Sequence, residues 1–303
     1  MNVIVTGAAG FAGIHLTKHL VEHGYNVYAV VRRGSDHNKR IDDIHAEGKI
    51  RIVEIDDSDF DSIPGRINEN CEYFFHMAHR PGGRNDEIIA YSNVEDIKKA
   101  VKAAKGTGCR RFIGVGSQAE YGLVDGLITE DRLPAPFSMY GAAKVAECIM
   151  SRTQSQIAGL EWVWGRIFSL IGEYEPKGRL IPDLVDSLKH LNENSGKGEN
   201  VIRLSAATQY WDYLDAGDCA EAFIALAEKG KNGEIYNVAN GDYHPLKYYT
   251  ELLKDIYAPG TAMNYGEESN PRVSLQPDVS KIQTSTGWKA SVRFIDAIRR
   301  VYN

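Results

Sequence analysis

The stretch Ile4-Val5-Thr6-Gly7-Ala8-Ala9-Gly10-Phe11-Ala12-Gly13-Ile14 decides the fold of this chain. An apolar run over residues 2–5 predicts a strand, and residues 14–20 have helical spacing. Gly7 permits a tight turn after the strand, Gly10 lets the backbone approach a pyrophosphate, and Gly13 lets the helix lie against the sheet. The unpaired first amides of that helix favour an anion. Glycine also marks ordinary turns, but this strand and helix context favours a dinucleotide-binding loop.

Composition describes an ordinary globular protein. The chain has 303 residues, 43% of them apolar, and a formal net charge of −6. This acidic balance gives no basic surface for nucleic acid or an anionic membrane. No apolar run approaches the roughly 18 residues of a membrane span, and no signal peptide precedes the first strand. The four cysteines are scattered singly, which predicts free thiols in a reducing compartment. We expect a cytoplasmic protein with neither nucleic acid nor membrane as partner.

Strand and helix patterns alternate through the first half of the chain. Further strands are predicted at residues 27–31, 50–55, 73–77, 111–115 and 162–167, with helices at residues 12–23, 87–104 and 138–157. Short parallel strands separated by crossover helices are typical of an α/β fold. The sequence therefore predicts a doubly wound parallel sheet of the Rossmann type.

The alternation stops after Ile167. Glycines, prolines and a polar stretch at residues 192–200 divide the following segment into short pieces. Residues 212–240 then resume a helix and a strand, while further helices are expected near residues 246–257 and 294–301. We predict two interleaved domains. Residues 1–168 plus 212–240 form the dinucleotide-binding domain, and residues 169–211 plus 241–303 form a smaller α+β substrate-binding domain.

Tyr140 and Lys144 are four residues apart and share one face of a predicted helix. A free tyrosine has a pKa of about 10, and a nearby ammonium or a cationic nicotinamide ring favours the phenolate. Tyr140 could then exchange a proton with a carbonyl or an alcohol. The spacing also occurs by chance on many helices, so a second feature is needed.

Ser117 supplies that second feature. It lies at the carboxyl end of the strand predicted over residues 111–115, at the edge where doubly wound folds bind ligands. Its hydroxyl could hydrogen-bond the same substrate oxygen that Tyr140 protonates.

Taken together, these motifs resemble the extended short-chain dehydrogenases/reductases, the branch of nucleotide-sugar epimerases, dehydratases and 4-keto reductases. The resemblance covers nearly the whole chain. It rests on Thr6-Gly7-x-x-Gly10-x-x-Gly13, Phe75-His76-Met77-Ala78, Tyr91-x-Asn93-Val94, Ser117 before Tyr121-Gly122, Tyr140-x-x-x-Lys144, Arg166-Ile167-Phe168-Ser169, Trp211-Asp212-Tyr213, and Asp278-x-Ser280-Lys281 before Gly287-Trp288.

The resemblance implies roles for particular residues. Ser117, Tyr140 and Lys144 would form the catalytic set, with Tyr140 and Lys144 also touching the cofactor and Lys144 holding the nicotinamide ribose. Asp56 or Asp57 would meet the adenine edge. The remaining expected cofactor contacts are Gly7, Gly10, Phe11, Ala12, Gly13 and Ala78. The helices at residues 88–104 and 138–157 resemble those that form a dimer interface in the family, which implies a homodimer.

Two departures from the family pattern concern the reaction. Val31 occupies the usual acidic position after the second strand, and Arg32 and Arg33 follow it. Two guanidiniums suit a 2′-phosphate, which favours NADP(H), whereas a solvated strand edge would leave NAD possible. In related 4,6-dehydratases an Asp-Glu pair follows the serine or threonine, but Gln118 and Ala119 stand here. Dehydration is therefore disfavoured, and Ala119 also replaces the cysteine of some epimerising relatives.

The substrate-binding residues depart from the pattern as well. Ser169 stands where relatives usually have asparagine, and Trp211 where they have an arginine that contacts the substrate pyrophosphate. Arg203 or Arg272 could supply the missing charge, or could be surface cations. Trp211 could stack on a base or fill the core between domains. Gln118, beside Ser117, completes the expected substrate contacts.

His15, His19 and His23 recur every four residues, but we attribute this pattern to a partly solvated helix face and predict no metal site. The preferred function is a reductase that uses NADP(H) on a 4-keto sugar linked to a nucleotide. An NAD(P)-dependent 4-epimerase is the alternative, distinguished by turnover without net cofactor consumption. A non-catalytic cofactor-sensing protein is a third hypothesis, although such a protein needs no Ser-Tyr-Lys set.

Overall fold

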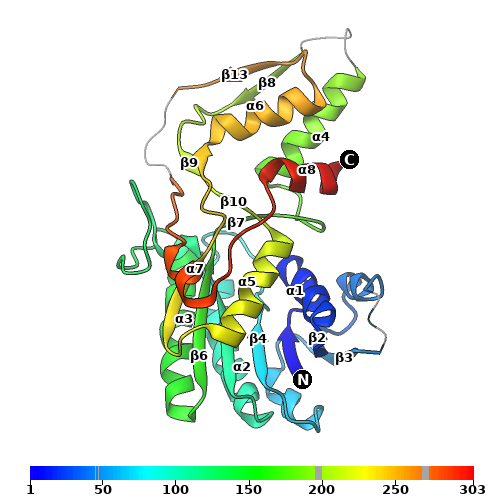
Figure 1. The fold of residues 1–303 in the computed structure, drawn as a ribbon, viewed down its shortest axis with the longest axis vertical. Helices are drawn as coiled ribbons and strands as arrows, with labels where there is room; N and C mark the ends of the chain where they lie inside the picture. Colours follow the sequence, from blue (N-terminus) through cyan, green and yellow to red (C-terminus); the bar gives the residue numbers. More distant parts are fainter. Residues whose placement is uncertain (45, 47, 195–199, 268–272) are drawn as a thin grey trace.

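The computed structural model describes residues 1–44, 46, 48–194, 200–267 and 273–303. Seven parallel strands form its central sheet, in the order β11-β6-β5-β4-β1-β2-β3 (Figure 1). The strands are β1 (Asn2–Thr6), β2 (Asn26–Arg32), β3 (Ile50–Ile55), β4 (Tyr73–His76), β5 (Arg111–Ser117), β6 (Glu161–Ile167) and β11 (Glu234–Val238). The strand order reverses between β1 and β4, so the prediction of a doubly wound sheet is confirmed.

Helices cover both faces of this sheet. Helices α1 (Phe11–Glu22) and α5 (Ala216–Lys229) pack together on one face, and α2 (Glu87–Gly106) and α3 (Met139–Ala158) on the other. Alternate residues of each strand supply the two cores, because side chains point to opposite faces of a sheet. Val3 and Val5 pack toward α1, whereas Phe74 and Phe112 pack toward α2. Short α7 (Ser280–Thr286) lies against α5 and β11.

Three short 3-10 helices lie in the connections between the strands and helices of the described residues: η1 (Asp36–Ile41), η2 (Phe60–Gly65) and η3 (Gln118–Glu120). Helix η3 directly follows the carboxyl end of β5, and η1 is separated from the carboxyl end of β2 by three residues. They therefore lie at the edge of the sheet where ligands bind in doubly wound folds.

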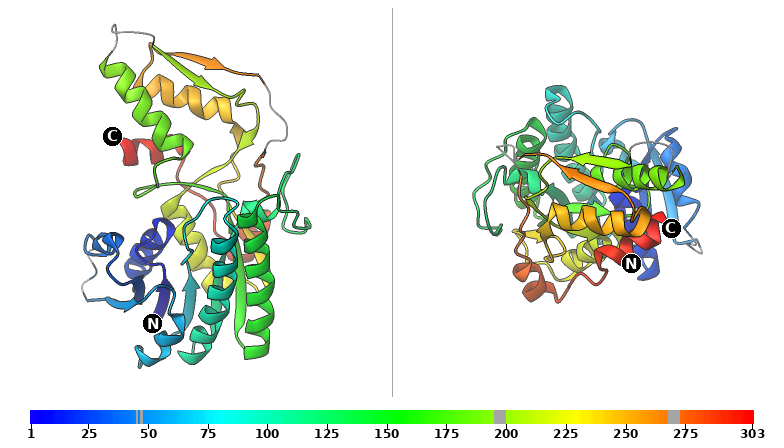
Figure 2. Two further views of the ribbon diagram at one scale, coloured as in Figure 1. Left: turned by 180° about the vertical axis from the view of Figure 1, so that it is seen from behind. Right: turned by 90° about the horizontal axis from the view of Figure 1, so that it is seen from above.

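A smaller region lies beyond the carboxyl ends of the central strands (Figures 1 and 2). It contains α4 (Leu180–Glu193), α6 (Leu246–Tyr257) and α8 (Phe294–Tyr302). Its strands pair two by two: β8 (Val201–Leu204) with β13 (Ala262–Tyr265), β9 (Tyr210–Trp211) with β12 (His244–Pro245), and β7 (Ser169–Ile171) with β10 (Tyr213–Asp215). A third core, including Leu184, Tyr213 and Leu253, joins the helices of this region.

The division into domains at 168/169, 211/212 and 240/241 stays a prediction, and the separate cores support it. One expectation for the smaller region was wrong. The sequence predicted only short pieces between residues 169 and 211, but α4 is a helix of 14 residues. Pro182 lies in its first turn, where the missing N–H would have no helical partner.

Candidate active site

The three glycines of the first loop are required by their surroundings. Gly7 has φ of +66°, and a Cβ built on it would lie 2.7 Å from the Cα of Ala78. A Cβ on Gly13 would lie 2.1 Å from the carbonyl oxygen of Gly7. Gly10 is the N-cap of α1 and has no side chain to occupy the first helical amides. The cradle fits a pyrophosphate, and it brings the expected cofactor contact Ala78 against the loop. Phe11 and Ala12 begin α1 here, both partly buried.

Arginines and aspartates meet at the carboxyl ends of β2 and β3. The Arg33 Nε lies 2.9 Å from the Asp56 Oδ1, and both side chains are exposed. Asp57 accepts a hydrogen bond of 2.5 Å from the Arg80 Nη1. Arg32 is exposed beside them. The residues expected at the adenosine end of a cofactor therefore lie together, with Asp56 partly offsetting the charge of Arg33.

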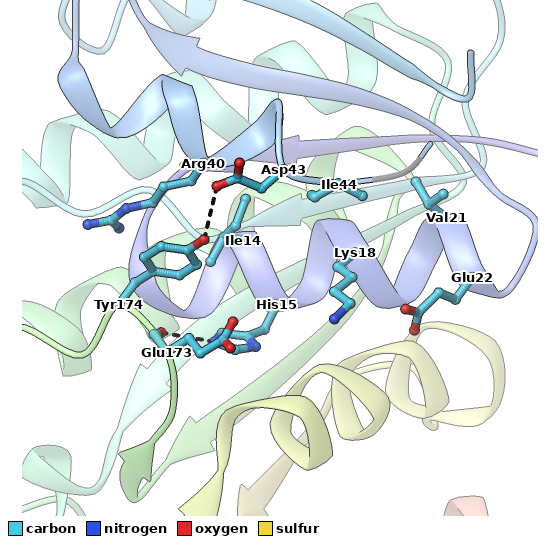
Figure 3. A pocket seen from close by; sticks show the side chains of 10 residues that line it. All are labelled: Ile14, His15, Lys18, Val21, Glu22, Arg40, Asp43, Ile44, Glu173 and Tyr174. Atoms are coloured by element: carbon cyan, nitrogen blue, oxygen red, sulfur yellow. Dashed lines mark hydrogen bonds between the residues drawn. The ribbon is translucent and has the colours of Figure 1, made fainter. Parts of the chain in front are cut away.

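Sequence analysis missed Arg40, which lies on η1 close to the glycine loop. Its Nη1 donates to the Ala9 carbonyl over 3.2 Å, and its guanidinium lies 4.7 Å from the centre of the Tyr174 ring. Tyr174 in turn donates to the Asp43 Oδ2 over 3.3 Å (Figure 3). These side chains line a pocket of about 200 Å³ along α1. The only sequence signal for Arg40 was its place after the Arg32-Arg33 pair, because its contacts join segments that are distant in the sequence.

Ser117 ends β5 within a buried hydrogen-bond network. Its Oγ accepts from the Ala119 amide over 3.2 Å, and its own amide donates to the Glu120 Oε1 over 2.9 Å. The other oxygen of Glu120 accepts from the Arg166 Nε over 2.7 Å. Trp164 donates to the same carboxylate. Because the Ser117 Oγ acts as an acceptor in this network, the serine hydroxyl proton is left to donate elsewhere.

Tyr140 and Lys144 lie on the first turns of α3, which packs closely on η3. A Cβ on Gly141 would lie 2.5 Å from the Ala119 carbonyl oxygen, so glycine permits this approach. The Lys144 Nζ donates to the Val115 carbonyl over 3.2 Å and to the Glu147 Oε2 over 2.7 Å. Burial opposes its charge, but Glu147, Tyr140 and Glu120 together outweigh this effect and raise the pKa of Lys144. The structure thus brings Tyr140 and Lys144 to the strand end that carries Ser117.

His79 was also missed by the sequence analysis. Its ring stands edge-on to that of Tyr140, with 5.3 Å between ring centres, and its side chain is exposed. Many atoms nonetheless surround the ring, and this environment, together with the Lys144 ammonium, lowers the pKa of His79 below its usual range. A neutral imidazole therefore flanks the tyrosine. Its position two residues after Phe75-His76-Met77 was the only sequence signal.

The expected substrate-binding residues are spread more widely. Gln118 follows Ser117 on η3, and Ser169 begins β7. Trp211 is half-buried on β9 and packs against two hydrophobic clusters, one of which is the core of the smaller region. Arg203 lies on β8, in the outer sheet of the smaller region (Figure 1). Arg272 lies outside the described residues. The roles of these residues stay predictions.

The histidines of α1 contact carboxylate and carbonyl oxygens. The His19 Nδ1 lies 2.7 Å and the His23 Nε2 3.0 Å from one oxygen of Glu221 on α5. His15 contacts the Glu173 carbonyl. In the part of the chain that the structure describes, no group of three or more His, Cys, Asp or Glu side chains is arranged to hold a metal ion. Within the same part, no helix is long and apolar enough to cross a membrane.

The fold and the glycine cradle define a doubly wound protein of the dinucleotide-binding class. Comparison with known proteins gives the family. The model of the NAD dependent epimerase/dehydratase family matches residues 3–239. The chain belongs to this family, whose members are NAD-dependent enzymes.

Individual relatives are distant but cover the chain almost completely. A low-salt glycan biosynthesis protein of Haloferax volcanii is 27% identical over 321 residues, covering 98% of this chain and 96% of its own. A dTDP-glucose 4,6-dehydratase of Streptomyces venezuelae, solved with NAD bound, has a TM-score of 0.83 at 22% identity over 99% of this chain and 95% of its own. A UDP-glucuronic acid 4-epimerase of Bacillus cereus, solved with UDP-glucuronic acid and NAD, has a TM-score of 0.83 at 22% identity, covering 99% and 97%. At this identity the solved structures support the fold.

Proposed function

We propose that this enzyme reduces a 4-keto group on a nucleotide-linked deoxysugar with NADP(H). The observation that carries the proposal is the convergence at the end of β5. The Lys144 Nζ reaches the Val115 carbonyl, and Gly141 lies against the segment that follows Ser117. Tyr140 therefore lies on the helix turn that packs against the segment following Ser117, with the Lys144 ammonium one helical turn away. This set of groups suits proton transfer at a carbonyl oxygen.

Ser117, Tyr140 and Lys144 each have a separate role in such a reduction. A bound reduced nicotinamide would supply the hydride. Ser117 donates a hydrogen bond to the carbonyl oxygen, and Tyr140 transfers its phenolic proton to that oxygen as negative charge develops there. Lys144 stabilises the phenolate that remains and would hold the ribose of a bound cofactor. The amides at the start of α1 would hold its pyrophosphate.

Two features favour NADP(H) over NAD. Arg32 ends β2, Arg33 follows it, and Arg40 donates to the Ala9 carbonyl of the glycine loop, so three guanidiniums come from segments near the carboxyl end of β2, where a 2′-phosphate is expected. The ion pair of Arg33 with Asp56 weakens its contribution. NAD is the cofactor in the solved relatives, and it stays the alternative.

The residues after Ser117 favour a reductase over a dehydratase. Gln118 and Ala119 bring no carboxylate, and Glu120, the next residue, is fully buried and held by Arg166. A 4-epimerase uses the same Ser, Tyr and Lys, and the names of several relatives support it as the alternative function. Sugar nucleotides are the substrates named for these relatives, which supports a nucleotide-linked sugar here.

Cofactor stoichiometry distinguishes the two functions. The purified protein is incubated with dTDP- and UDP-linked 4-keto-6-deoxyhexoses and either NADPH or NADH. A reductase oxidises one NADPH per alcohol formed, whereas an epimerase interconverts the corresponding 4-hydroxy sugars with no net oxidation. Epimerisation without consumption, or inactivity with every keto sugar tested, would overturn the proposal.

The preference for NADPH is tested separately with the Arg32→Ala variant. We expect the affinity for NADPH to fall about tenfold and that for NADH to change little, because only NADPH carries the 2′-phosphate. Arg51→Ala is the control, since Arg51 is a half-exposed arginine on neighbouring β3 that pairs with Glu69. Equal losses for the two cofactors would contradict the role of Arg32.

We further propose a homodimer formed through α2 and α3. These adjacent helices expose large apolar side chains to solvent: Ile88, Tyr91, Ile149, Met150 and Ile157. Such an exposed apolar surface is typical of an interface. The variant Ile149→Glu should sediment as a monomer while the unaltered protein sediments as a dimer. Four buried thiols without disulfide partners support a cytoplasmic location, which cell fractionation tests.

A further inference from the structure

Three buried or half-buried ion pairs lie close enough to the Glu147 carboxylate to act on it electrostatically. Lys144 pairs with Glu147 on α3, Glu120 of η3 pairs with Arg166 of β6, and Asp96 of α2 pairs with Arg80 after β4. Each pair consists of one cation and one carboxylate. Since Glu120 and Asp96 each have a dedicated arginine, Glu147 is the carboxylate left to balance the charge of Lys144.

Among the described residues, the Glu147 carboxylate makes its one hydrogen bond with Lys144. Both side chains are almost fully buried, with residue exposures of 2% and 5%. The Glu147 Oε2 accepts from the Lys144 Nζ over 2.7 Å, whereas its Oε1 is buried with no hydrogen-bond partner among the described residues. A buried carboxylate oxygen without a partner costs stability. The contact with Lys144 is thus the one polar interaction of this carboxylate in the described part of the chain.

We propose that Glu147 is a positioning residue that fixes the Lys144 ammonium and offsets its charge, so that Tyr140 keeps its proton and is poised to donate it to a carbonyl. This inference deepens the proposed reductase function and rests on it. It names the residue that favours proton donation over proton removal. A reduction begins with a protonated tyrosine, whereas oxidation of an alcohol begins with the phenolate.

The sign of the effect follows from electrostatics. A cation near a phenol favours the phenolate, and an anion nearby favours the neutral phenol. The Lys144 ammonium by itself would favour the phenolate of Tyr140, but the adjacent carboxylate of Glu147 offsets much of this electrostatic effect. Removing the charge of Glu147 leaves the ammonium uncompensated in a buried site. The phenolate of Tyr140 then becomes easier to form.

Other charged groups face this pair from every packed element. From η3 and α2 come Glu120 and Asp96, each already paired with arginine. From the end of β4 come His76 and His79, whose pKa values burial and Lys144 hold low, so both are neutral. Neither histidine therefore gains a charge near neutral or alkaline pH. Burial also raises the pKa of Glu147, with Lys144 opposing that effect.

The test measures the titration of Tyr140 directly. Phenolate absorbance is recorded against pH for the full-length protein and for Tyr140→Phe, and the difference isolates Tyr140. In Glu147→Gln the midpoint of this titration should fall by about one pH unit. Glu95→Gln is the matched control, because Glu95 also pairs with a lysine three residues away but on the exposed surface of α2. Its midpoint should equal that of the unaltered protein.

Two further variants keep the test decisive. Glu147→Asp retains the charge and should titrate close to the unaltered protein. The double variant Lys144→Gln/Glu147→Gln removes both charges and should restore the midpoint, which a merely structural role for Glu147 does not predict. If Glu147→Gln does not fold, Glu147→Met replaces it as the neutral variant. A midpoint that stays or rises in the neutral variant overturns the proposal.

The titration needs no substrate, so its result stands whether or not a keto sugar is reduced. If reduction is observed, the alkaline decline of kcat should shift to lower pH in Glu147→Gln by the same amount as the titration. A shifted titration with no reduction of any keto sugar would contradict the proposed function and leave the effect of Glu147 on Tyr140 intact. An unshifted titration in an active reductase would contradict the role of Glu147 alone.

Discussion

The Arg166 Nε lies 2.7 Å from the Glu120 Oε2, and the exposures of these two residues are 2% and 0%. Glu120 also accepts from the amide of Ser117, so this ion pair holds the end of β5 to β6. Arg166 lies over the ring of Tyr121, 4.4 Å from its centre. The position of the serine hydroxyl therefore depends on a buried charge pair that does not itself face the substrate.

Removing the carboxylate should strongly destabilise the protein. The variant Glu120→Ala leaves the Arg166 guanidinium buried without a counter-charge, which costs about 3–5 kcal/mol of unfolding free energy. Denaturation in urea measures the loss. Glu95→Ala removes an exposed partner of Lys98 and should cost less than about 1 kcal/mol. Equal losses in the two variants would show that the Glu120 pair is not the anchor of this segment.

The sheet and the helix that carries Tyr140 and Lys144 could be predicted from the sequence because their determinants are local, whereas the catalytic roles of Ser117, Tyr140 and Lys144 stay predictions. Glycine spacing, apolar runs and a four-residue helical spacing each act within one or two turns of chain. The strand that returns to the sheet at β11 was also predicted, since residues 212–240 repeat the helix-then-strand pattern.

Contacts between distant segments could not be predicted in this way. Arg40 reaches Ala9, and His79 meets Tyr140, through the packing of separate elements. The pairing of Arg33 with Asp56 likewise depends on β2 and β3 lying side by side. Helix α4 was missed because its proline was taken as a break, although proline is tolerated in a first turn.

The glycine loop leads to a prediction about cofactor binding. In Gly13→Ala the new Cβ would fall 2.1 Å from the Gly7 carbonyl oxygen, so α1 must move away from the loop. We expect a loss of at least about tenfold in dinucleotide affinity, because the helical amides no longer face the pyrophosphate. Fluorescence titration with NADPH measures it. Gly65→Ala, where a Cβ meets nothing within 4 Å, is the control and should bind normally.

Tyr140→Phe tests the proton donor. Removing the hydroxyl should lower kcat by about 10²–10⁴-fold, the range of a general acid, and leave the dissociation constant of the cofactor within about twofold. Tyr248→Phe removes the hydroxyl of an exposed tyrosine on α6 and should have no effect on either quantity. Turnover close to that of the unaltered protein in Tyr140→Phe would remove Tyr140 from the mechanism.

His76 makes the stability of the fold depend on pH. Its Nδ1 lies 2.9 Å from the Thr6 Oγ1, and its ring lies buried between Phe60 and Phe112. Burial, assisted by the Lys144 ammonium, lowers the pKa of His76 to about 3. In the unfolded chain a histidine titrates near pH 6.5, so between pH 6.5 and about 3 the unfolded state binds the extra proton. The contribution of the neutral His76 ring to the unfolding free energy is therefore complete above pH 6.5 and declines as the pH falls toward 3.

The variant His76→Asn isolates this effect, because asparagine keeps a polar atom near the position of Nδ1 but does not titrate. The unfolding free energy of the unaltered protein relative to the variant should fall by about 1.4 kcal/mol between about pH 7.5 and 5.5. His15 and His79 also have lowered pKa values, but they remain in both proteins and cancel in the difference. Exposed His37→Asn should show no such change. A constant difference across this pH range would mean that His76 can be protonated in the folded state.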